Sequence, residues 1–242
     1  MKSYQLRTFN LLLISLLSVA SWQCNRQEAI PDILKNHPEK DTFTKLKEAK
    51  TIALFNGKDY TGWYTYTPNY GTDNDVEKAF TVEDGVMKFS GPSMGYVCTK
   101  DSYKNYYLRL QIRWGDRKYP PRENVRRDSG LLYHFPEGVN DELWPLSVEC
   151  QIQEDDFGDY YFVNGALAGG SSDGIIHSAN FEKAIPEWNT IEVICVDNKS
   201  EHYVNGHLVA QAQELNLNEG KIFLQLEGAE VFYKDIVLLP LK

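Results

Sequence analysis

Residues 144–162 read WPLSVECQIQEDDFGDYYF, and the alternation of side chains within this stretch decides which fold we expect. Successive side chains of a β-strand point to opposite faces. Val148, Cys150 and Ile152 therefore share one face, and this face has the composition of an apolar core. The opposite face is polar and consists of Ser147, Glu149, Gln151 and Gln153. The stretch thus predicts a strand that packs one face into a core and presents a second, hydrogen-bonding face.

The polar face of this strand has an unusual composition. It holds a carboxylate and two amides, where Thr, Lys or Tyr is more common on the outside of a sheet. Aromatic residues border it in the sequence: Trp144, Phe157, Tyr160, Tyr161 and Phe162. Hydrogen-bonding groups bordered by flat rings are what the binding of a sugar ring requires. Two interpretations follow, a carbohydrate-binding surface or a solvated outer sheet face.

The rest of the chain from Thr51 onward consists of short apolar or alternating runs, most of them separated by Gly, Asn or Asp. The expected strands are 80–82, 86–89, 96–98, 106–114, 129–135, 147–153, 160–163, 190–196, 200–204, 207–212, 221–226 and 231–238. Asn205-Gly206, between two of these runs, is the strongest hairpin signal. No long stretch keeps a helical period. The sequence predicts an all-β protein, a two-sheet antiparallel sandwich of the jelly-roll type.

Length and composition favour a single domain over residues 51–242. A chain of 242 residues, 42% of them hydrophobic, can form one large β domain with a full core. The net charge of −9 argues against a nucleic-acid partner, because phosphate binding needs a basic surface.

The first 24 residues have the organisation of an export signal. Lys2 and Arg7 give a positive start, and residues 11–19 form an apolar run too short to span a membrane. Cys24 stands where a bacterial lipoprotein signal places its lipidated cysteine, although the residues before it depart from the usual small side chain. The looser signals of Bacteroidota lipoproteins resemble this pattern. We expect an exported protein, lipid-anchored at Cys24 in the cell envelope (periplasm or outer membrane), with residues 25–50 as a tether.

Three cysteines follow Cys24. An odd number in an exported protein permits one disulfide and one free thiol, or no disulfide. Cys150 and Cys195 lie on expected apolar strand faces, so buried free thiols are the simpler expectation for them and for Cys98. The sequence has no CxxC or HExxH motif, so no thiol-rich zinc site is indicated.

Three other segments repeat the polar alternation of the opening stretch. The polar residues are Arg109, Gln111 and Arg113 in 107–114, His134 in 129–135, and Gln225 and Glu227 in 221–227. If these strands are neighbours, their polar faces form one concave wall. Each residue alone has an ordinary structural explanation: the arginines as solvated charges, His134 as a hydrogen-bonded core histidine, and Glu227 as part of a turn.

Several short motifs occur in a fixed order along the domain. They are Leu54 to Trp63 (LFNGKDYTGW), Arg126 to His134 (RRDSGLLYH), Trp144 to Glu154 with Gly158-Asp159, Glu187-Trp188-Asn189, His202 to Gly206 (HYVNG), Leu224 to Val231 (LQLEGAEV) and Ile236 to Leu241. In this order the chain resembles the 3-keto-disaccharide hydrolase family from about Thr51 to its C-terminus. It departs from the family pattern at His134, where many relatives carry Arg, and at Lys234-Asp235, where Arg-Asn is more usual.

The resemblance implies a concanavalin A-like, glucanase-like sandwich that acts on glycosides already oxidised at C3 by a sugar 3-dehydrogenase. A ketone at C3 acidifies the proton on C2, so a carboxylate can remove it while the C1 oxygen is expelled. Water then adds to the enone, and the net result is hydrolysis. Such a site needs a base, an electrophile for the C3 oxygen and an acid for the leaving group.

The resemblance and the polar faces together suggest roles for individual residues. We expect Glu149 to be the base, His134 the acid or electrophile, and Glu227 the second carboxylate. The expected substrate-binding residues are Gln151 and Gln225, with Arg109, Arg113 and Asp128 as further candidates and Trp144 as a stacking surface. Two carboxylates and a histidine on one wall would also suit a divalent metal ion that polarises the ketone.

Two alternative functions remain open. Glu149-x-Gln151-x-x-Glu154 is similar to the acidic strand of retaining laminarinase-type endo-glycanases, but Glu154 has the opposite parity and Gln151 replaces an acid. The other alternative is a non-catalytic carbohydrate-binding module, in which Glu149→Gln would leave sugar affinity intact.

Overall fold

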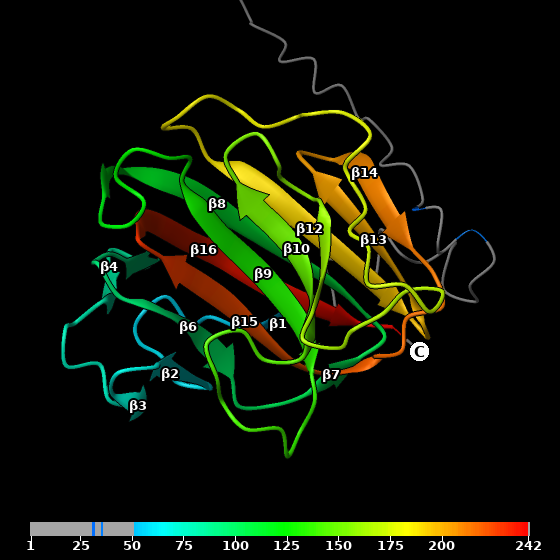
Figure 1. The fold of residues 1–242 in the computed structure, drawn as a ribbon, viewed down its shortest axis with the longest axis horizontal. Coiled ribbons are helices and arrows are strands. Elements are labelled where there is room, and N and C mark those ends of the chain that lie inside the picture. The colour runs from blue at the N-terminus through cyan, green and yellow to red at the C-terminus, as the bar shows by residue number, and fades with distance from the viewer. Residues whose placement is uncertain (1–30, 32–34, 36–50, 242) are drawn as a thin grey trace, which may run out of the picture.

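The computed structural model describes residues 31, 35 and 51–241, which contain sixteen β-strands and no helix (Figure 1). The strands are β1 Ile52–Ala53, β2 Trp63–Thr67, β3 Gly71–Thr72, β4 Phe80–Glu83, β5 Val86–Phe89, β6 Met94–Thr99, β7 Tyr103–Lys104, β8 Tyr106–Lys118, β9 Asp128–Phe135, β10 Ser147–Gln153, β11 Tyr160–Val163, β12 Asn189–Val196, β13 Lys199–Val204, β14 His207–Ala212, β15 Glu219–Glu227 and β16 Ala229–Pro240. The predicted export signal, Cys24 and nearly all of the predicted tether lie outside the described residues. In the part of the chain that is described, no helix is long and apolar enough to cross a membrane.

The strands form two eight-stranded sheets that stack face to face (Figure 1). Sheet A has the order β14-β13-β12-β8-β16-β5-β4, with β1 paired to β16. Sheet B has the order β11-β10-β9-β15-β6-β2-β3, with β7 paired to β15. The strand pairs are antiparallel, as in β10 with β9 and β12 with β8. The predicted antiparallel sandwich is confirmed, but the prediction missed β1, β2, β3 and β7.

The core lies between the inner faces of the two sheets and follows from the period of two. Leu108, Leu110 and Ile112 of β8 and Val148 and Ile152 of β10 are fully buried there. Burying one such side chain contributes about 1.5–3 kcal/mol relative to leaving it exposed. Because the alternate residues of β10 must then face outward, the packing of this core fixes the direction of its polar side chains.

A polar network crosses the core near one edge of the sandwich. The hydroxyl of Tyr133 lies 2.9 Å from Oγ of Ser200 and 2.9 Å from Nε2 of His202. Nδ1 of His202 lies 2.9 Å from the carbonyl oxygen of Gly158, and its ring stacks on Tyr160 with centroids 3.6 Å apart. Burial lowers the pKa of His202 to about 3. The histidine of the HYVNG motif is therefore a neutral residue that joins β13 to the segment before β11.

The three described cysteines, Cys98, Cys150 and Cys195, are buried and free, as expected. Burial raises the pKa of all three thiols. They are consequently poor nucleophiles and pack as small apolar side chains.

Candidate active site

The outer face of sheet B carries a row of polar side chains across its central strands. Gln151 of β10 stands opposite Gly130 of β9, and β9 pairs with β15 so that Gln225 continues the row. Directly opposed residues of antiparallel strands point to the same face. The next residue of the row is Tyr96 of β6, opposite Gln225. The predicted convergence of the polar faces of 147–153 and 221–227 is therefore confirmed.

Glu149 is held above Gly130 in this row. A methyl group on Gly130 would clash with the Glu149 carboxylate and would lie 2.7 Å from Oε1 of Gln225. The two side chains thus occupy the space that a larger residue at 130 would fill. No hydrogen bond or ion pair joins the Glu149 carboxylate to another described residue, although Glu149 is only 6% exposed. Glycine is required at 130 because the site needs this space.

The pKa of Glu149 is raised well above its ordinary value. The main cause is burial, which disfavours the charged form, and the carboxylates of Asp128 and Glu227 add to it. Burial with one unpaired carboxylate and two acidic neighbours is a costly arrangement for a purely structural residue. Such a group, once deprotonated, is a stronger base than an exposed glutamate.

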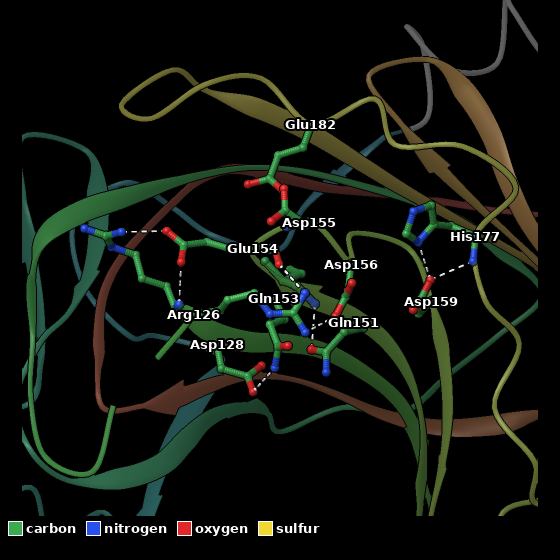
Figure 2. A network of polar contacts seen from close by, with 12 residues as sticks. Arg126, Asp128, Gln151, Gln153, Glu154, Asp155, Asp156, Asp159, His177 and Glu182 are labelled. Atoms are coloured by element: carbon green, nitrogen blue, oxygen red, sulfur yellow. Dashed lines mark hydrogen bonds and ion pairs between the residues drawn. The ribbon is translucent and has the colours of Figure 1, made fainter. Parts of the chain in front are cut away.

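Asp128 and Glu227 lie at one end of the row and share an arginine. Nη2 of Arg122 lies 2.6 Å from Oδ2 of Asp128 and 2.9 Å from Oε1 of Glu227. Nε2 of Gln153 donates to Oδ2 of Asp128 over 2.6 Å (Figure 2). Burial still raises the pKa values of both carboxyl groups. Sequence analysis missed Arg122, because it lies in the segment between β8 and β9, where no strand period marks it.

Several polar atoms of this face lack partners within the protein. Oε1 of Gln225 and Oδ1 of Asp128 are buried, and no described residue donates to them. An unsatisfied buried acceptor costs about 1–3 kcal/mol. Oε1 of Gln151 accepts from the backbone N–H of Ile152 over 2.9 Å, and its NH2 group donates to no other described residue. A ligand rich in hydroxyl groups could donate to the two acceptor oxygens and accept from the NH2 group of Gln151.

A loop between β9 and β10 is fastened over the other side of this face. Oδ1 of Asp141 accepts hydrogen bonds from the hydroxyls of Tyr64 (2.8 Å) and Tyr96 (2.7 Å), and its Oδ2 accepts from Thr72 (3.0 Å). Trp144 belongs to the same loop and is half-buried. The predicted stacking residue therefore lies on a segment that Asp141 ties to sheet B.

The structure does not bring His134 to Glu149 and Glu227. Its backbone has a φ of 59°, and the register between β9 and β15 shifts at this point. The imidazole is fully buried and lies edge-on to Tyr133 (4.9 Å) and to Tyr106 of the opposite sheet (5.9 Å). Burial lowers its pKa to about 4. The expectation of an acid or electrophile at His134 is corrected, because the bulge turns this ring into the core.

Arg109 and Arg113 also lie elsewhere. Both belong to β8, which is in sheet A, so their side chains are on the opposite side of the sandwich. Arg109 stands opposite Glu192 of β12. The guanidinium of Arg113 lies over the rings of Trp188 (5.1 Å) and Phe232 (4.9 Å). The prediction that these arginines bind substrate beside Glu149 is wrong, since strand alternation does not say which sheet a strand joins.

The described residues contain no group of three His, Cys, Asp or Glu side chains that could hold a metal ion. Glu149, Glu227 and His134 were expected to bind such an ion together, but the His134 ring points into the core, away from the two carboxylates. These three residues therefore do not form a shared metal site in the described part of the chain.

Glu154 follows the end of β10, and both oxygens of its carboxylate bind Arg127. Its Oε1 lies 2.6 Å from Nη1 of Arg127, and its Oε2 accepts from the Arg127 backbone over 2.8 Å. This second carboxylate of the glycanase alternative thus holds the start of β9 and does not pair with Glu149.

The chain matches one family model and is similar to several solved structures. Residues 50–239 match the family model described as "3-keto-alpha-glucoside-1,2-lyase-like domain". A solved structure of a candidate glycosyl hydrolase from Parabacteroides distasonis ATCC 8503 is 25% identical, with a TM-score of 0.58 over 82% of this chain and 97% of that chain. A second such protein from the same organism is 20% identical, with a TM-score of 0.56 over 79% and 100%.

A β-glucanase from Bacillus licheniformis is 14% identical, with a TM-score of 0.52 over 80% of this chain and 99% of that chain. This likeness concerns the fold and confirms the predicted concanavalin A-like, glucanase-like sandwich. None of the curated proteins compared with the chain matches it.

Proposed function

The chain belongs to the family of 3-keto-alpha-glucoside-1,2-lyase-like domains, and from that premise we propose that it cleaves 3-keto-glycosides by elimination across C1 and C2. Family membership and the similar glycosyl hydrolase structure support the broader statement that it acts on glycosides. The finer assignment, to 3-keto substrates, rests on the family and on the chemistry that Glu149 can perform.

The proposed reaction begins with a proton transfer. The C3 ketone acidifies the C2–H bond, and the Glu149 carboxylate takes this proton. The electron pair of that bond forms the C1=C2 double bond as the C1–O bond breaks, and the leaving oxygen takes up a proton. The products are an alcohol and a 2-hydroxy-enone. Addition of water, with hydroxide at C1 and a proton at C2, gives the free 3-keto sugar.

One observation carries the proposal: the unpaired, buried Glu149 carboxylate held over Gly130 beside Gln225. A general base works best when its pKa lies near the pH at which the enzyme operates, and for a reaction near neutral pH this is well above the pKa of an ordinary carboxyl group. Burial together with Asp128 and Glu227 raises the pKa of Glu149 in that direction. A glutamate neutralised by an arginine would lack this basicity.

The neighbouring groups suit a sugar that lies along the row. The free NH2 group of Gln151 can donate to a hydroxyl or to the C3 oxygen, and the unsatisfied oxygens of Gln225 and Asp128 can accept from hydroxyls. Glu227, tied to Arg122, is the second carboxylate and contributes to the basicity of Glu149. Trp144 is the candidate stacking surface.

The proposed substrate requires an earlier step, because ordinary glycosides carry a hydroxyl at C3. An oxidoreductase acting on sugars at C3 must therefore supply it. We further propose that both steps occur in the cell envelope, with this protein anchored there through Cys24; the sequence pattern of residues 1–24, which predicts an export signal, supports this proposal.

The test compares a 3-keto-α-disaccharide with its unoxidised parent, using the full chain and the Glu149→Gln variant. Cleavage of the 3-keto sugar alone, lost in the variant, is the expected result. Cleavage of the unoxidised sugar alone would support the glycanase alternative. Binding without turnover, unchanged in Glu149→Gln, would support a carbohydrate-binding module.

A further inference from the structure

His177 and Asp159 form a hydrogen-bonded pair at the edge of sheet B. Oδ1 of Asp159 lies 2.6 Å from Nδ1 of His177 and accepts from the His177 backbone N–H, also over 2.6 Å (Figure 2). The side chain of Asp159 is 3% exposed and that of His177 is 14% exposed. Because a carboxylate oxygen accepts the bond, Nδ1 carries the hydrogen. Nε2 is then the nitrogen that is available for proton transfer.

Asp159 lies directly before β11, the strand that pairs with the Glu149 strand β10. The backbone N–H of Gln151 donates to the carbonyl of Asp159 over 2.9 Å, so Asp159 extends the polar row by one strand. Tyr161, two residues further, stands directly opposite Glu149. Asp159 is thus a diagonal neighbour of Glu149, at about 7–8 Å between backbones.

Electrostatics agrees with this placement. The pKa of Tyr161 is raised, first by burial and then by the charges of Asp159, Asp156, Glu149 and Asp128. The placement itself rests on the register, which sets Tyr161 opposite Glu149 and Asp159 two residues before Tyr161.

The segment that carries His177 is held at several points. Ile175 forms a backbone bridge with Tyr160, and the N–H of Ser178 donates to the carbonyl of Val209 in β14 over 2.8 Å. Phe181 stacks on His207 of β14 with centroids 4.0 Å apart. The imidazole is therefore presented from a fixed segment that spans the edges of the two sheets, which is what a precisely directed proton transfer requires.

We propose that His177 is the general acid of the cleavage reaction, with Asp159 as the residue that orients it; this inference rests on the proposed function. Glu149 takes the C2 proton while the proton on Nε2 of His177 moves to the departing C1 oxygen. The imidazole ends neutral and the carboxyl group ends protonated, so charge and protons balance. Asp159 holds the ring in the tautomer and orientation that direct Nε2 away from the Asp159 carboxylate. This assigns the role that His134 does not fill.

The experiment uses His177→Asn and two 3-keto-α-glucosides, one with a methoxide and one with a 4-nitrophenolate leaving group. An asparagine amide can keep the hydrogen bond to Asp159 but has no Nε2. Nitrophenolate leaves without protonation, whereas methoxide does not. We expect the variant to lose about 10²–10⁴-fold in kcat on the methyl glycoside and to retain most of its rate on the nitrophenyl glycoside.

Two further variants keep the result interpretable. Asp159→Asn should reproduce the leaving-group dependence more weakly, because it disturbs the ring without removing the acid. His207→Gln loosens the same segment and should slow neither substrate selectively. Equal loss on both glycosides in His177→Asn, or no loss on either, would overturn the inference. Absence of cleavage by the wild-type protein would refute the proposed function instead, and the two failures are thereby distinguished.

Discussion

Replacing Gly130 with alanine tests the convergence of Glu149 and Gln225 directly. The backbone at this position does not need glycine, because its φ is not in the left-handed region, so the added methyl group is the only change. Oε1 of Gln225 must retreat from 2.7 Å to at least the 3.4 Å of an ordinary contact, and the Glu149 carboxylate must move further. A displacement on the order of 1 Å at the reacting group costs about 10²-fold in rate. The displaced atoms are the ends of flexible side chains, so the free energy of unfolding should fall by only about 1 kcal/mol.

The assay is kcat/KM on a 3-keto-disaccharide together with chemical denaturation. Gly115→Ala is the matched control, because its methyl group would meet the side chain of Glu230 in sheet A, away from the site. We expect a similar small loss of stability in both variants and a large loss of activity only in Gly130→Ala. Full activity of Gly130→Ala would refute the placement of Glu149 as the base.

Four further predictions concern single residues of the sheets and of the segments that connect them. Because burial raises the pKa of Glu149 in the folded protein, ionisation of this one group makes folding less favourable as pH rises above about 4.5. Glu149→Gln should therefore be more stable than the wild type at pH 8, with the difference shrinking at pH 5; urea denaturation at both values measures this. Arg122→Met leaves two buried carboxylates without a cation, so it should cost about 3–5 kcal/mol at pH 8 and less at pH 5; an equal loss at both pH values would contradict the shared ion pair. Asp141→Ala leaves two buried tyrosine hydroxyls unpaired and should cost about 2–4 kcal/mol in denaturation; a loss below that range would mean that the loop is held by other contacts. Arg113→Ala should leave kcat/KM unchanged, because this residue lies on the far face of the sandwich, and a tenfold loss would show that sheet A takes part in catalysis.

The polar alternation in 147–153 and 221–227 was enough to place Glu149, Gln151, Gln225 and Glu227 on one face, because the apolar residues of both strands must face the core. The same alternation in 107–114 led to a wrong prediction for Arg109 and Arg113. It shows which residues of a strand share a face, but it does not show which sheet the strand joins, and β8 belongs to sheet A.

His134 illustrates a second limit. Strand alternation predicted that its side chain shares a face with Gly130. The backbone of His134 instead has a positive φ at a shift in the register of β9 with β15, and its ring points inward. Such a local irregularity is set by the pairing of β9 with β15, which the sequence of β9 does not contain.

Arg122 and His177 illustrate a third limit. Both lie in connecting segments, where no periodicity marks the residues that reach a site. They become visible only through the contacts they make, Arg122 to two carboxylates and His177 to Asp159. Asp159 was included in a motif, yet nothing in the sequence connected it with a histidine eighteen residues later.

The fate of the hydrogen on C2 tests the central claim most directly. A 3-keto-glycoside carrying deuterium at C2 is cleaved in ordinary water, and the released 3-keto sugar is analysed by mass spectrometry, with the same labelled product incubated alone as the control for spontaneous exchange. Elimination through Glu149 predicts that each turnover replaces the C2 deuterium with protium from water. Release of a sugar that still carries its deuterium would mean that the glycosidic bond breaks without proton abstraction, and would contradict the account.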